Sequence, residues 1–207
     1  MTDICLQEYF SQEQSISNSK TILSHKKPIE KNTKELASFE GYYWNYNDNY
    51  SRQIAILDDT LYYMRANNDN TALIPVGENE FEMQTDEYTS VSFISNQMNV
   101  TLDDGYVIVF DKYIPANYTM NSLEEFTGNY FSPELNAYYT FNIEENILYA
   151  NHQRLGNFNL TAVMKDYFIG SKGSFREISF HRNNLGKVIG FKVSSSRAKD
   201  IFFEKVK

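Results

Sequence analysis

Histidine and cysteine are the side chains of this 207-residue chain with the greatest capacity to hold a metal ion. The three histidines, His25, His152 and His181, lie far apart, and none has a partner at the i, i+4 spacing of a helical zinc motif. The single cysteine, Cys5, can form neither an internal disulfide nor a multi-cysteine metal site. We therefore expect surface or hydrogen-bonded histidines, no metal site and no cofactor.

Neighbouring acidic residues are the second group that could do chemistry. Glu124-Glu125 and Glu144-Glu145 would each point to opposite faces of a strand, so neither pair forms an acid/base pair by itself. Asp103-Asp104-Gly105 and Asn67-Asn68-Asp69-Asn70 offer oxygen ligands, but they lack the spaced carboxylates and closing Glu of a calcium loop. These patterns predict solvated loops and turns, and no catalytic residue.

Closely spaced aromatic residues are the best candidates for a ligand or interface site. They are Tyr42, Tyr43 and Trp44 in one stretch, and Tyr62 and Tyr63 in another. Half of the residues along a strand face outwards, and an exposed tyrosine buries a large area in an interface at low entropy cost. Packing in a core or barrel wall is the alternative interpretation, and the more common fate of aromatic side chains.

The elements that position these residues are predicted to be β-strands. The chain is 42% hydrophobic and 15% aromatic, with Gly, Asn and Asp between short apolar runs, a composition that favours β structure. A net charge of −8 argues against nucleic acid as a partner. The apolar runs are too short to span a membrane, and the chain opens without the features of a secretory signal, so we expect a cytoplasmic protein.

An internal repeat dominates the sequence. Phe39, Gly41 and Tyr43 recur 87 positions later as Phe126, Gly128 and Tyr130, and the same shift holds without a gap to Phe93 and Phe180. An unbroken register of this length indicates two copies of one module. We assign residues 36–116 to the first copy, residues 117–207 to the second, and residues 1–35 to a short helix (2–10) followed by a polar linker.

The register slips near the end of the second copy. Residues 109–112 match residues 202–205, which lie six positions later than the shift of 87 requires. We predict that the last hairpin, around Ser194 to Arg197, is longer than its counterpart, and we include Arg197 among the candidate site residues. Any site should lie between Phe180 and Phe202, or in the Tyr-rich start of the first copy.

Each copy contains eight strand-sized apolar runs separated by turn residues. They extend from Gly41–Trp44 to Tyr106–Asp111 in the first copy, and from Gly128–Phe131 to Ile201–Lys205 in the second. Closing eight antiparallel strands into an up-and-down barrel removes the exposed sheet edges. The predicted fold is therefore all-β, with two tandem lipocalin-like barrels that each enclose either a side-chain core or one small ligand.

The order of motifs in both copies resembles a known family. These motifs include Gly41-Tyr42-Tyr43, Leu61-Tyr62-Tyr63, Glu125–Leu135 and Asp166-Tyr167-Phe168. Over residues 36–206 they are similar to the lipocalin-like C-terminal region that follows the catalytic domain in bacterial β-lactamase-related serine hydrolases. The resemblance implies a module separated from its enzyme, with a serine-hydrolase domain as its partner, in a family whose members can be exported.

The catalytic domain of this family carries Ser-x-x-Lys and Tyr-x-Asn motifs. Ser17, Ser24 and Ser196 are each followed three residues later by lysine, and Tyr43-Trp44-Asn45 has the second spacing. The first two serines lie in the polar linker, the third in a predicted hairpin and the tyrosine in a strand, so none has the required context. We therefore expect that this chain is not an enzyme.

Three functions remain open on the sequence alone. The preferred one is a non-catalytic accessory module beside a serine-hydrolase domain. The second is a free-standing barrel that binds a small apolar ligand, and the third is a protein interaction module that uses the Tyr-rich first copy.

Overall fold

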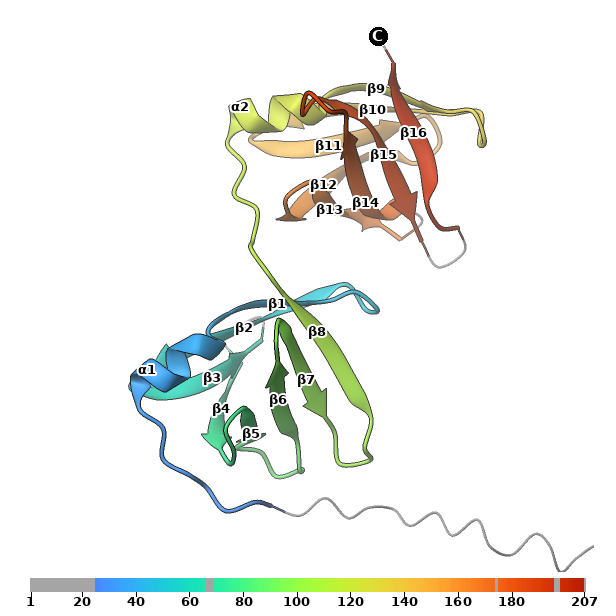
Figure 1. The fold of residues 1–207 in the computed structure, drawn as a ribbon. Coiled ribbons are helices and arrows are strands. Elements are labelled where there is room, and N and C mark those ends of the chain that lie inside the picture. Colours follow the sequence, from blue (N-terminus) through green and yellow to red (C-terminus); the bar gives the residue numbers. More distant parts are fainter. Residues whose placement is uncertain (1–24, 66–68, 174, 196–197, 207) are drawn as a thin grey trace, which may run out of the picture. The chain divides into compact units, whose positions relative to one another are not determined.

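The computed structural model describes residues 25–65, 69–173, 175–195 and 198–206. It contains two compact units, and each is built on a closed barrel of eight antiparallel strands (Figure 1). The predicted all-β class with two tandem eight-stranded barrels is confirmed. The helix expected over residues 2–10 lies outside the described residues.

The first barrel is preceded by a short helix and a single 3-10 turn. These are α1 (Thr33–Leu36) and η1 (Ala37–Phe39). The strands are β1 (Gly41–Asn45), β2 (Tyr50–Leu57), β3 (Thr60–Met64), β4 (Asn70–Pro75), β5 (Glu80–Met83), β6 (Ser90–Ile94), β7 (Gln97–Thr101) and β8 (Val107–Tyr113). Asp58 and Asp59, between β2 and β3, have φ of 46° and 59°, as the tight turn predicted there requires.

The second barrel repeats this order. It begins with α2 (Met120–Leu123) and η3 (Glu124–Phe126). The strands are β9 (Gly128–Ser132), β10 (Ala137–Glu144), β11 (Ile147–His152), β12 (Gly156–Met164), β13 (Tyr167–Lys172), β14 (Phe175–Arg182), β15 (Val188–Ser194) and β16 (Ile201–Val206). In the described part of the chain, no helix is long and apolar enough to cross a membrane.

Strand pairing reproduces the repeat. In the first barrel Tyr63 lies opposite Ile54 on β2 and Thr71 on β4. In the second, Ala150 lies opposite Phe141 and Phe158, which are the residues 87 positions later. The duplication therefore extends from sequence to register.

A cluster of four rings closes one end of each barrel. It consists of Phe39, Tyr43, Phe81 and Phe93 in the first barrel, and Phe126, Tyr130, Phe168 and Phe180 in the second. The ring centre of Phe39 in the 3-10 turn lies 5.0 Å from that of Phe81 on β5. In the second copy the ring centre of Phe126 lies 5.1 Å from that of Phe168 on β13. In each copy the tyrosine hydroxyl on the first strand donates to the carbonyl of the phenylalanine in the 3-10 turn. The distance is 2.8 Å from Tyr43 to Phe39 and 2.7 Å from Tyr130 to Phe126. These bonds fix the turn as a plug over the core.

The six extra residues lie in a different hairpin from the one predicted. Phe93 pairs with Met98 in the first barrel, whereas its counterpart Phe180 pairs with Phe191. From there the spacing to the last strand is the same in both copies, because Met98 pairs with Phe110 and Phe191 with Phe203. The longer hairpin therefore joins β14 to β15, and the prediction of a longer hairpin around Ser194 to Arg197 is wrong.

The described part of the predicted linker is bound to the first barrel. Its residues are mostly exposed, but the Ile29 N–H donates to the Pro75 carbonyl at 2.9 Å and the Lys26 N–H to Glu82 at 2.7 Å. Asn32 and Glu35 form a capping box that starts α1. Residues 25–35 therefore form a strap rather than a free linker.

Candidate functional site

The structure distributes the predicted aromatic residues over both sides of the barrel wall. Tyr42 faces outwards with 39% of its surface exposed, whereas Tyr43 and Trp44 are buried. On β3, Tyr62 is half-buried and Tyr63 is buried. They do not form one contiguous aromatic patch. Arg197 lies outside the described residues.

The Tyr43-Trp44-Asn45 pattern is engaged in scaffold contacts. The Tyr43 hydroxyl donates to the Phe39 carbonyl, and burial raises its pKa to about 12. The Asn45 amide donates to the Val109 carbonyl at 2.9 Å. At neutral pH this tyrosine is a protonated hydrogen-bond donor, not a base.

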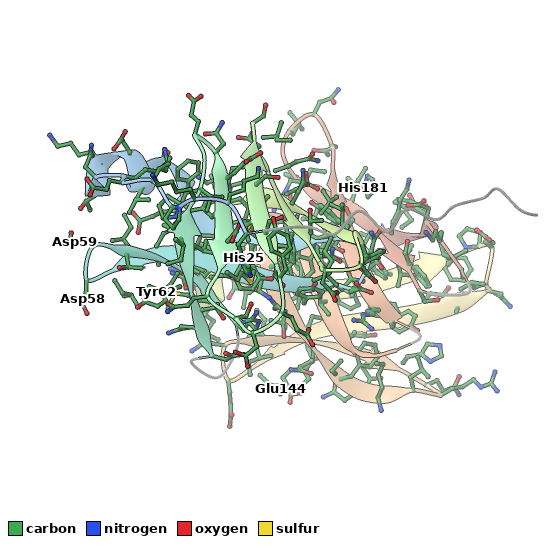
Figure 2. The ribbon with its side chains drawn as sticks, turned by 90° about the horizontal axis from the view of Figure 1, so that it is seen from below. His25, Asp58, Asp59, Tyr62, Glu144 and His181 are labelled. Atoms are coloured by element: carbon green, nitrogen blue, oxygen red, sulfur yellow. The ribbon has the colours of Figure 1, made fainter. Side chains whose placement is uncertain are left out.

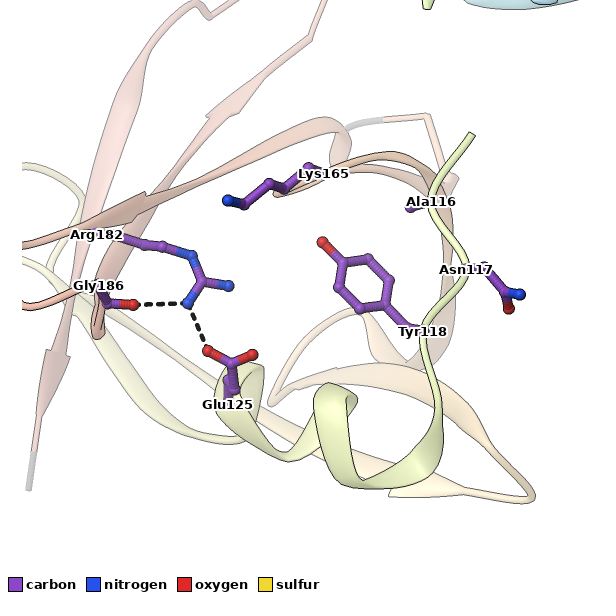
Figure 3. A pocket seen from close by; sticks show the side chains of 7 residues that line it. All are labelled: Ala116, Asn117, Tyr118, Glu125, Lys165, Arg182 and Gly186. Carbon is purple, nitrogen blue, oxygen red and sulfur yellow. Dashed lines mark hydrogen bonds and ion pairs between the residues drawn. The ribbon is translucent and has the colours of Figure 1, made fainter. Parts of the chain in front are cut away.

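A surface pocket of about 390 Å³ lies at the plugged end of the second barrel (Figure 3). It is lined by the residues that enter the barrel, Ala116, Asn117 and Tyr118, by Glu125 of η3, by Lys165 of the β12–β13 turn, and by Arg182 and Gly186 of the longer hairpin. The hairpin that interrupts the repeat therefore contributes directly to this pocket.

Arg182 is the centre of the pocket. Its Nε and Nη2 atoms donate to the two carboxylate oxygens of Asp166 at 2.9 and 2.8 Å. Nη1 donates to the Gly186 carbonyl at 2.7 Å and to the Glu125 carboxylate. The hydrogen bonds to Asp166, with a smaller contribution from the bond to Glu125, raise the Arg182 pKa above its ordinary value, so the side chain remains a cation.

Aromatic rings support this ion network. The Arg182 guanidinium carbon lies 5.5 Å from the centre of the Phe126 ring. The Tyr118 ring stacks on Phe168 at 5.5 Å, and its hydroxyl accepts the Asp166 N–H at 2.8 Å. Burial raises the Tyr118 pKa.

The pocket residues hold three segments of the second barrel together. Arg182 joins the β12–β13 turn, the β14–β15 hairpin and η3, and it does so with charge-assisted hydrogen bonds. A protonated phenol and a guanidinium bound to two carboxylates provide no activated nucleophile or general base. Lys165 is exposed, and Figure 3 shows it on the side of the pocket opposite Glu125.

Arg182 was not among the site residues predicted from the sequence. A site was expected either between Phe180 and Phe202 or in the Tyr-rich start of the first copy, and the first of these ranges includes both Arg182 and Gly186. The break in the repeat register was therefore the sequence feature that pointed to this pocket. The partner carboxylates, at positions 125 and 166, come from segments too far away in the sequence to suggest an ion pair.

The histidines and loop acids lie in separate environments. The His25 Nδ1 atom is 2.8 Å from a Glu82 carboxylate oxygen, and His152 stacks on Tyr139 at 4.5 Å. Figure 2 shows Asp58 and Asp59 at the tip of the hairpin between β2 and β3. Within the described ranges, no three His, Cys, Asp or Glu side chains converge to hold a metal ion.

No protein-family model matches the chain, and a search of curated proteins finds no match.

Proposed function

We propose that this chain is a non-catalytic β-barrel accessory module that packs beside a serine-hydrolase catalytic domain and shapes its substrate access or assembly. The proposal rests on the resemblance of residues 36–206 and on one structural observation. The polar groups best placed for chemistry, the Tyr43 phenol and the Arg182 network, are committed to scaffold contacts.

The interior of the second barrel supports this function over that of an apolar carrier. Ten aromatic residues of its core are buried: Phe126, Tyr130, Tyr139, Phe141, Phe158, Phe168, Phe175, Phe180, Phe191 and Phe203. The Phe191 ring also stacks on the buried Phe203 ring at 4.8 Å with an interplanar angle of 6°. A ligand in this lumen would have to displace side chains packed as in a protein core, which costs several kcal/mol per aromatic residue (about 3–5 for Phe to Ala).

The test is a turnover assay of the purified full chain with p-nitrophenyl acetate, p-nitrophenyl butyrate and a chromogenic cephalosporin. We expect rates equal to those of the same protein unfolded in urea. Three control variants, Ser17→Ala, Ser24→Ala and Ser196→Ala, cover the serines with Ser-x-x-Lys spacing. Robust turnover that one of these substitutions abolishes would contradict the proposal.

A further inference from the structure

Two charged groups in the pocket of the second barrel are open to a ligand. The Lys165 ammonium forms no ion pair or hydrogen bond with another residue that the structure describes. The Glu125 carboxylate accepts from Arg182 through Oε2, and within the described ranges no donor reaches its second oxygen. Both side chains line the same cavity of about 390 Å³, a volume in the range of small-molecule sites (about 300–1,000 Å³).

The two groups lie on opposite sides of this cavity. Figure 3 shows the Lys165 ammonium and the Tyr118 hydroxyl on one side and Glu125 on the other. The Tyr118 oxygen accepts the Asp166 N–H at 2.8 Å, and its own hydrogen has no acceptor in the described part of the chain. One side therefore offers an ammonium and a hydroxyl as donors, and the other offers a carboxylate oxygen.

The charges around the cavity favour a ligand that carries both signs. Arg182 pairs with two carboxylates, Asp166 at 2.8 Å and Glu125, so these three side chains together hold one negative charge. Lys165 places one positive charge across from them, while Lys205 donates to the Glu125 carbonyl at 2.8 Å and does not line the cavity. A simple anion would face Glu125 and a simple cation would face Lys165, whereas a zwitterion is complementary to both.

The first barrel forms the matching turn without these groups. The Phe93 N–H donates to the Asn79 carbonyl at 2.9 Å, as the Phe180 N–H donates to the Asp166 carbonyl at 2.8 Å. The positions 87 residues before Tyr118, Glu125, Lys165 and Arg182 hold Lys31, Ser38, Glu78 and Ser95. Neither the tyrosine hydroxyl nor the lysine ammonium is therefore needed to form this end of a barrel.

We propose that the pocket binds a small amino acid as its zwitterion, with the ligand carboxylate on Lys165 and the Tyr118 hydroxyl and the ligand ammonium on Glu125. Both ends form charge-assisted hydrogen bonds, which are stronger than neutral ones. Ala116 and the Tyr118 ring line the cavity beside these groups and contact the rest of the ligand. Arg182 positions Glu125 and does not itself bind the ligand. This site goes beyond the accessory role and does not depend on it.

The test is a titration of the ¹⁵N-labelled full chain, followed by NMR at the backbone amides of Glu125, Lys165 and Asp166. The zwitterionic probes are L-leucine, with its charges on neighbouring carbons, and 5-aminopentanoate, with its charges at the two ends of a chain. N-acetyl-L-leucine keeps only the negative charge and L-leucinamide only the positive one. All four are added at about pH 6.5, where the amines are protonated, and at constant ionic strength.

We expect saturable shifts with at least one zwitterion, and binding about tenfold weaker or less for both single-charge analogues. Saturation by leucine alone identifies an α-amino acid site, and saturation by 5-aminopentanoate alone identifies a site for an ω-amino acid. Saturation by both identifies a pocket that accepts either spacing. Absence of saturable shifts with both zwitterions, or equal affinity for a single-charge analogue, would overturn the proposal.

Substitutions decide whether the two charged groups are responsible. Lys165→Gln and Glu125→Gln should each weaken binding of the zwitterion by about tenfold or more, because each removes a charge-assisted hydrogen bond. Lys172→Gln, which changes an exposed lysine of the same barrel, should leave the dissociation constant unchanged. Circular dichroism checks that each variant is folded, and Lys165 is exposed, so its substitution leaves the core intact. Unchanged affinity in folded Lys165→Gln would overturn the proposal.

Discussion

Arg182→Met should destabilise the second barrel selectively. The substitution removes the guanidinium that joins Asp166, Glu125 and Gly186 but retains most of the aliphatic side chain. The Arg182 and Asp166 side chains are each 19% exposed, so they form a largely desolvated ion pair. Asp166 would be left with an uncompensated charge.

The expected cost follows from these contacts. Loss of a buried ion-pair partner costs about 3–5 kcal/mol, and the partial exposure lowers this to about 2–4 kcal/mol. The Glu125 side chain is 44% exposed, so its pair adds at most about 1 kcal/mol. For a barrel of this size, the melting temperature of the second barrel should fall by about 10 °C or more.

The single tryptophan makes the barrels separately observable. Trp44 lies on β1, so its fluorescence reports the first barrel, while far-UV circular dichroism reports both. In Arg182→Met, a dichroism transition should move to lower temperature while the Trp44 transition stays in place. A double-mutant cycle with Asp166→Asn should give a coupling of about 1–3 kcal/mol.

The first barrel supplies a matched control. Its counterpart of Asp166 is Asn79, an exposed residue, so Asn79→Ala should change stability by less than about 0.5 kcal/mol. A change of similar size for Arg182→Met, or a coupling near zero, would refute the view that Arg182 clamps the fold.

Three further changes test the packing and the titrating groups. Tyr130→Phe deletes the 2.7 Å bond to the Phe126 carbonyl, and urea unfolding should show a loss of about 1–2 kcal/mol in the second barrel; no loss would mean that the carbonyl finds another donor. Gly170→Ala would place a Cβ 2.0 Å from the Phe175 carbonyl oxygen, so the second barrel should lose more than about 2 kcal/mol, and an unchanged melting temperature would contradict the close approach of β13 and β14. Burial lowers the pKa of His152 below 6.5, so its stabilising contribution is present above pH 6.5 and is lost as the pH falls through the folded-state pKa; His152→Gln should flatten the decline in stability between about pH 7 and pH 5, and identical pH profiles would refute this.

The fold was accessible from the sequence because the repeat, the alternation and the turn residues agree. Ile54 and Val91 lie on the buried face as their alternation predicts, and Asp58 and Asp59 adopt the positive φ of a tight hairpin. The polar composition of residues 25–35 predicted a linker and gave no sign that this segment binds the first barrel. Asn32 and Glu35 do have the spacing of a capping box, which marks the start of a helix.

The location of the insertion and the Arg182 network were harder to predict. Matching anchors at Phe180 and Phe202 reveal six extra residues but not their position between the anchors. Arg182 acquires its role from acids of two other segments, and only the folded barrel brings these together.

If the module is non-catalytic as we propose, it carries no activated nucleophile. The most direct measurement is labelling of the folded full chain with a fluorophosphonate probe, followed by intact-mass and peptide mass spectrometry. Such a probe labels an activated serine whatever substrate that serine acts on. We expect no more label on the folded chain than on the chain unfolded in urea, whereas stoichiometric labelling of one serine, lost on heating through the unfolding transition, would show that the module carries an activated serine.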